Sequence, residues 1–204
     1  MALVFDGSAN TLTGLATAGA GIPGTEVVAA GALANGAIIQ VQQTSFTTNS
    51  DVAMDTAGTW YTISDLNVNI TPKTNSNKIL VSGHIFGETS HYEHHNHWRI
   101  ARTISGGSLA PININTHSSP GNRTIMTGTV LIGYQNNHAT TPTSISIPAY
   151  LDSPATTNQI TYHVQLMNYN DSSANFNLNH TKDDSDTGAH ERGTSWLTVM
   201  EVVA

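Results

Sequence analysis

Ile160-Thr161-Tyr162-His163-Val164-Gln165-Leu166 is the stretch that decides the fold class, because apolar and polar residues alternate through it without a break. Successive side chains of a β-strand point to opposite faces of a sheet, so this period of two predicts one buried and one solvent-facing side. An amphipathic helix would instead repeat its apolar residues every three or four positions. The stretch therefore predicts a half-buried β-strand.

The same alternation recurs from Ala37 to the end of the chain. Two further segments, 79–81 and 196–203, are apolar on both faces, as expected for central strands that are covered on each side. Clusters of Ser, Asn and Gly separate the segments, and no window has an apolar stripe of helical period. The other alternating apolar positions are Ile39 and Val41; Leu66, Val68 and Ile70; and Ile145, Ile147, Ala149 and Leu151.

About eight or nine such strands predict an all-β domain over residues 37–204, an antiparallel two-sheet β-sandwich or jelly roll. A closed barrel is the alternative. The composition agrees, since 28 Thr, 19 Asn and 18 Ser in 204 residues favour strands and turns over helices. No internal repeat of fixed period is found, which disfavours a propeller, a solenoid or a long β-helix.

The charge balance and the cysteine count exclude several function classes. Seven Lys and Arg residues stand against fourteen Asp and Glu, for a net charge of -7, so we expect no nucleic-acid partner. The absence of cysteine excludes disulfide frameworks, thiolate metal sites and cysteine nucleophiles. No apolar run approaches the ~20 residues that span a bilayer, and the first residues lack the basic segment of a signal peptide. We therefore expect neither membrane insertion nor a secretory signal.

Residues 1–36 differ from the rest, because Gly, Ala and Thr dominate and large apolar side chains are few. Such a segment cannot bury enough surface to fold alone. It predicts an extended N-terminal arm that orders against its own copies or against a docking partner. A flexible leader without a role is the alternative.

Several strings of the chain resemble, in order and spacing, the distal domain of a family of bacteriophage tail-fibre or head-fibre proteins. Residues 5–11 with Leu15-Ala16 resemble the leader seen in such fibres, and residues 84–97 depart from the family pattern by carrying a histidine cluster. The strings of the distal domain are Gly36-Ala37-Ile38-Ile39-Gln40-Val41, Ile70-Thr71-Pro72, Ser76-Asn77-Lys78-Ile79-Leu80-Val81, residues 149–157, residues 160–165 and residues 192–202.

This resemblance implies a homotrimeric virion structural protein. Its β-sandwich head, residues 37–204, would bind a host cell-surface glycan or protein receptor, and residues 1–36 would attach it to a phage tail or capsid component. The location implied is the virion surface, tail or capsid, after synthesis in the host cytoplasm. A capsid-decorating head fibre or cement protein is an alternative that differs only in where residues 1–36 attach.

An enzyme, such as a glycan-degrading tailspike, is a further alternative. The sequence favours a protein without catalytic activity, since it contains neither G-x-S-x-G nor H-E-x-x-H and few acidic residues within its strands. A glycoside hydrolase would need two carboxylates at a defined spacing.

Five of the ten histidines lie between His84 and His97. If the segment continues as a strand into Trp98 and Ile100, alternation places His95 and His97 on one face. Such a pair, repeated around a three-fold axis, would offer six imidazoles to one transition-metal ion, and some phage fibre tips look like this. The alternative is a polar recognition loop without metal.

The receptor-binding residues are expected in turn-rich segments that hold exposed aromatic or amide groups, because recognition surfaces lie on loops. Aromatic rings stack on sugar faces and amide groups bond to sugar hydroxyls, which makes a glycan a sensible ligand. An ordinary polar loop is the alternative. The candidates are Tyr92, His94, His117, Tyr134, Asn136, Asn137 and His138.

Overall fold

The computed structural model describes residues 4–6, 11–13, 33–90, 95–112, 121–130, 142–170 and 173–204. The chain divides into two units, Met1–Ala37 and Ile38–Ala204. In the first unit, β1 (Val4–Asp6) pairs antiparallel with β2 (Thr11–Thr13). The role expected for residues 1–36 stays a prediction. In the described part of the chain no helix is both long and apolar enough to cross a membrane.

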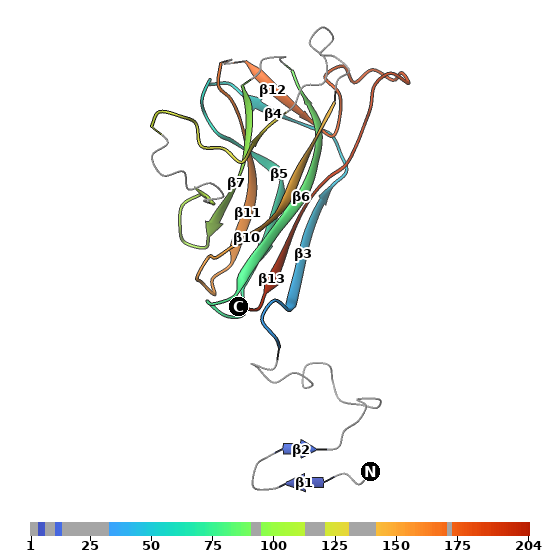
Figure 1. The fold of residues 1–204 in the computed structure, drawn as a ribbon. Coiled ribbons are helices and arrows are strands. Elements are labelled where there is room, and N and C mark those ends of the chain that lie inside the picture. Colours follow the sequence, from blue (N-terminus) through green and yellow to red (C-terminus); the bar gives the residue numbers. More distant parts are fainter. Residues whose placement is uncertain are drawn as a thin grey trace. The chain divides into compact units, whose positions relative to one another are not determined.

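The second unit is a sandwich of two antiparallel sheets (Figure 1). The six-stranded sheet has the order β3-β13-β6-β12-β4, with β10 also paired to β6, and the five-stranded sheet has the order β5-β11-β7-β8, with β9 paired to β7. The strands are β3 (Ile38–Phe46), β4 (Ser50–Met54), β5 (Tyr61–Ile70), β6 (Lys78–Thr89), β7 (Asn96–Ile104), β8 (Ala110–Pro111), β9 (Gly128–Thr129), β10 (Thr143–Asp152), β11 (Ile160–Asn168), β12 (Ala174–Leu178) and β13 (Ser195–Val202). The predicted all-β, two-sheet fold is confirmed.

The core lies between the sheets and is built from the inward half of each alternation. Ile160, Tyr162, Val164 and Leu166 of β11 are fully buried, and so are the matching apolar residues of β5. The predicted inner faces of these two strands are therefore confirmed. Burial of such side chains contributes roughly 1.5–3 kcal/mol each, which makes this core the main stabilising term.

β6 and β13 pair in the middle of the six-stranded sheet, as predicted for segments that are apolar on both faces. Their inner residues are fully buried, among them Val81 and Val199. Their outer faces differ from the expectation, because Trp196 is 38% exposed and Leu80 and Met200 are only half-buried. Among the described residues of one chain, these central strands are covered on one side only.

The alternation predicted for 145–151 is correct for Ile145 and Ile147 and wrong for the rest. A β-bulge between Ile147 and Tyr150 shifts the register of β10 against β6, so that the following residues exchange faces. Leu151 is consequently 41% exposed on the outer face, and Asp152 is buried. The predicted inward position of Ala149 is also wrong, since this residue is exposed.

The prediction for β3 needs a similar correction. The strand forms, but Val41 pairs with the outward-facing Met200 and is 54% exposed. Its register is set by β13, whose ladder with β3 has an irregularity between Glu201 and Val202. Gln40, which pairs with the buried Glu201, lies on the inner side instead.

Asp152 joins the two sheets through a buried polar contact. Its Oδ2 accepts a hydrogen bond from the Tyr162 hydroxyl on β11 at 2.7 Å and forms an ion pair with Arg102 Nη1 on β7. Burial and the neighbouring Asp152 carboxylate raise the pKa of Tyr162, so its hydroxyl stays a donor. The bulge of β10 therefore places a charged group of one sheet against its partners on the other.

We expect Asp152→Asn to destabilise the domain by about 3 kcal/mol, because it leaves the Arg102 charge without its partner in a mostly buried site. Thermal unfolding monitored by circular dichroism measures the change. Asp184→Asn is the matched control, since Asp184 pairs with Arg192 at the surface and its loss should leave Tm almost unchanged. Equal Tm values for the two variants would contradict the inter-sheet role of Asp152.

Candidate functional site

Two of the nine predicted site residues, His95 and His97, are within the described structure, at the beginning of β7. Strand β7 continues into the buried Trp98 and Ile100, as expected from the sequence. The other seven lie outside the described residues, so their proposed role stays a prediction. They are Tyr92, His94, His117, Tyr134, Asn136, Asn137 and His138.

A ladder of asparagines fixes the end of the five-stranded sheet where β7 begins and β11 ends. Asn96 pairs with Asn168 across these strands, and the Asn168 amide donates to Asn96 Oδ1 at 2.8 Å. Both side chains are buried. The backbone N–H of Asn170 then donates to Asn168 Oδ1 at 2.9 Å, which holds the chain as it leaves β11. Buried amides that satisfy each other in this way give the strand ends one defined geometry.

Three side chains gather above this ladder, and we call them the Tyr169 corner: His95, Tyr169 and Asn170. The Tyr169 N–H donates to the His95 carbonyl at 3.0 Å, and the two rings lie 6.2 Å apart. The Asn170 amide nitrogen lies 2.7 Å from His95 Nδ1. All three residues are exposed, Tyr169 to 53%. The corner thus exposes an aromatic ring, an imidazole and an amide to solvent, on a backbone that is held by hydrogen bonds.

The sequence analysis did not select Tyr169 or Asn170 as site residues. A signal for Tyr169 exists, since it is an aromatic residue that directly follows the strand and precedes the turn cluster 170–173. His95 contacts both residues in space but is distant from them in the sequence. It lies 75 positions before Asn170. Only the pairing of β7 with β11 brings these residues together.

His97 lies on the same side of β7 as His95, with ring centroids 6.3 Å apart, but its side chain is buried. Desolvation lowers the pKa of His97 below its ordinary value of 6.5, and the His95 imidazole lowers it further. The ring is therefore neutral at pH 7, and its Nδ1 has no hydrogen-bond partner among the described residues. His95 is exposed and His97 is enclosed, so the pair does not present two equivalent imidazoles.

A transition-metal ion held by His95 and His97 stays a prediction. Within the described ranges no group of three or more His, Asp or Glu side chains is placed to hold a metal ion. The three-fold arrangement predicted from the sequence takes the remaining ligands from other copies of the chain.

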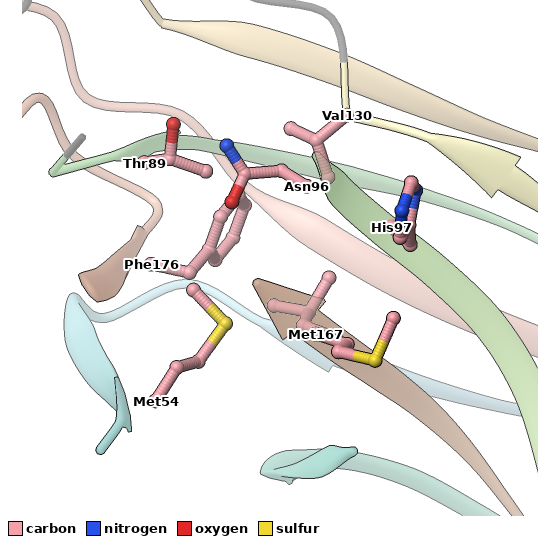
Figure 2. A pocket seen from close by; sticks show the side chains of 8 residues that line it. Met54, Thr89, Asn96, His97, Val130, Met167 and Phe176 are labelled. Atoms are coloured by element: carbon pink, nitrogen blue, oxygen red, sulfur yellow. The ribbon is translucent and has the colours of Figure 1, made fainter. Parts of the chain in front are cut away.

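A small gap lies between the two sheets, next to Asn96 and His97 at the beginning of β7 (Figure 2). Met54 and Phe176 line it from the six-stranded sheet, and Asn96 and Leu166 line it from the five-stranded sheet. It has no room for the centre of a water molecule. The gap is a packing feature that flexible methionine side chains accommodate, and it is not a ligand site.

Arg99, two residues beyond His97, adds a cation to the outer face of the five-stranded sheet. Its guanidinium carbon lies 4.1 Å from the centroid of the Trp60 ring, and its Nε donates to Gln165 Oε1 at 2.8 Å. Cation–π and hydrogen-bond contacts hold this side chain in one orientation. The surface beside the corner is therefore polar, aromatic and ordered.

Comparison with known proteins gives remote likenesses. No family model and no curated protein matches the chain. The structure of infectious bursal disease virus Gx strain is 9% identical, with 81% of this chain and 43% of that chain covered at a TM-score of 0.30. The crystal structure of the infectious bursal disease virus VP2 subviral particle is 10% identical, with 80% and 41% covered at a TM-score of 0.31. This chain spans about two fifths of the viral chains it resembles, and neither likeness assigns it to a family.

We expect the stability of the domain to decrease as the pH falls below 6.5, because His97 resists protonation when folded and accepts a proton when unfolded. The unfolded state then binds more protons, so acid favours unfolding. Tm measured across this pH range should fall less steeply in His97→Gln. The double variant with His163→Gln should be flatter still, since burial lowers the pKa of His163 as well. A wild-type slope in both variants would contradict this assignment.

Proposed function

We propose that the protein is a virion structural protein, a short fibre whose β-sandwich binds a host-surface glycan. The exposed Tyr169 corner carries this proposal. The ordered resemblance to tail-fibre and head-fibre proteins along the sequence supports the virion role. The corner supports recognition, because it lies beside the start of β7, directly after the segment 91–94 that holds two predicted receptor-binding residues.

The chemistry of the corner suits a sugar. The exposed Tyr169 ring offers an apolar face with a hydroxyl at its edge, and Asn170 offers an amide that both donates and accepts. The His95 imidazole adds a further polar group at the same spot. The asparagine ladder beneath holds the backbone of Asn170, and the Tyr169 N–H bonds to the His95 carbonyl, which reduces the entropy lost on binding.

The same proposal includes a homotrimer that attaches to a phage tail or capsid component through residues 1–36. Three linked heads would raise a weak glycan contact by about 10²–10⁴-fold through effective concentration. A capsid-decorating protein remains the second candidate, and it is favoured by the same sequence strings. The proposed function involves no catalysis.

We expect the purified protein to bind a subset of sugars on a printed array of oligosaccharides, and Tyr169→Ala to weaken that binding about tenfold, the factor that corresponds to roughly 1.4 kcal/mol of lost stacking. Leu109→Ala is the matched control. Leu109 is an exposed apolar residue next to β8, which pairs with the half of β7 remote from the corner. Its loss should leave binding unchanged.

Equal losses in both variants would contradict a site at the corner. A second readout addresses the enzyme alternative. Incubation of the protein with the bound oligosaccharide should return the oligosaccharide intact, and the appearance of shorter products would replace the binding role with a hydrolase or lyase.

A further inference from the structure

An apolar row crosses the outer face of the six-stranded sheet. The strand registers align Val41 of β3 with Met200 of β13, Met200 with Leu80 of β6, and Leu80 with Leu151 of β10. Val41 and Leu151, at the two ends of the row, are among the most exposed large apolar residues described. Four neighbouring strands thus present one continuous apolar band to solvent.

Two further apolar residues lie near this band, Ile38 beside it and Trp196 beyond a polar row of Gln43, Thr198 and Ser82. Ile38, near one end of β3, is more than half exposed. Trp196 of β13 stacks on His84 of β6, with ring centroids 4.5 Å apart. Contiguous exposed apolar surface of this kind marks an interaction site more often than isolated apolar residues do.

The face is almost free of charge, although the chain carries a net charge of -7. On the outer face, cross-strand rows run from Val41, Gln43 and Ser45 of β3 across the neighbouring strands. None of these three rows contains Asp or Glu. Lys78, at the beginning of β6, is the nearest formal charge on that strand. Two copies of an acidic chain repel each other where their carboxylates meet. Because this face lacks carboxylates, two copies can meet there without that electrostatic repulsion.

The edge of the sheet beside the row has no partner strand in the described part of the chain. β3 ends the strand order and pairs only with β13 among the described residues, and Figure 1 shows it at the margin of the sheet. Its nine residues, Ile-Ile-Gln-Val-Gln-Gln-Thr-Ser-Phe, contain no charge and no proline. Natural proteins usually guard an open edge with Lys, Pro or a bulge to prevent pairing with other chains. The one irregularity of the β3 ladder lies near its beginning, between Ile38 and Gln40, so the edge from Gln40 to Phe46 has none of these guards and is expected to be covered.

We propose that this face, made of the Val41-Met200-Leu80-Leu151 row and the adjoining β3 edge, is where copies of the chain meet. The occupant is a second copy, because a copy supplies the same apolar row and the same absence of carboxylates. The inference rests on the proposed homotrimer and names its interface. In a closed ring the contact is head-to-tail, so the β3 end of the row in one copy meets the β10 end in the next.

The first test is the mass in solution of the full chain and of Val41→Asp, measured by size-exclusion chromatography with light scattering. We expect the wild type at three times the 21.6 kDa chain mass and Val41→Asp at the mass of one chain, because each contact would bury an unpaired carboxylate against the apolar Leu151 end of the next copy. Leu109→Asp, an equal change at an exposed apolar residue outside this face, should remain a trimer. Circular dichroism of the variants confirms that each is folded.

The second test is cross-linking, which has no background because the chain contains no cysteine. The double variant Val41→Cys with Leu151→Cys should form covalent oligomers under mild oxidation. Leu109→Cys with Leu151→Cys should not. Val41→Ser is a milder variant that should weaken association without introducing a charge.

The outcomes separate the inference from the proposed function. A Val41→Asp chain that remains a trimer, together with a Val41→Cys and Leu151→Cys variant that fails to cross-link, would overturn the interface while leaving a trimeric fibre intact. A wild-type chain that is monomeric at micromolar concentration would overturn both the interface and the trimer. Glycan binding by the Tyr169 corner would still be judged separately on the array.

Discussion

Asp152 joins the two sheets through a buried polar contact, and its position depends on a single β-bulge in β10. Without the bulge, the alternation of β10 would turn Leu151 inward and Asp152 outward. With it, the carboxylate reaches Tyr162 and Arg102 on the opposite sheet. The cost of burying a charge is offset only by such partners, so the contact selects one pairing of the sheets over its alternatives.

The same bulge shapes the outer surface of the six-stranded sheet. It sends Leu151 to solvent, where this residue extends a row that begins with Val41 on β3. One local irregularity therefore provides both the polar contact inside the sandwich and one end of the apolar face outside it. The bulge therefore determines which residues of β10 face the core and which face solvent.

The two surfaces of interest belong to different sheets. The Tyr169 corner lies at the end of the five-stranded sheet, whereas the Val41 row covers the outer face of the six-stranded sheet. Their chemistry differs as well, since the corner is polar and aromatic and the row is apolar and nearly uncharged. Association through the row would leave the corner accessible, as multivalent recognition requires.

The sequence by itself determined the fold class and the inner faces of the regular strands. The alternation through β11 and β5 depends only on the geometry of a single strand, so Tyr162 and Val68 could be assigned to the core without a structure. The orientation of Leu151 and Val41 could not, because a bulge or a shifted register is set by the partner strand. The Tyr169 corner also required the tertiary structure, since the pairing of β7 with β11 alone brings His95 to Tyr169. Periodicity is a local property of the chain, whereas register and contact are decided between strands that are distant in sequence.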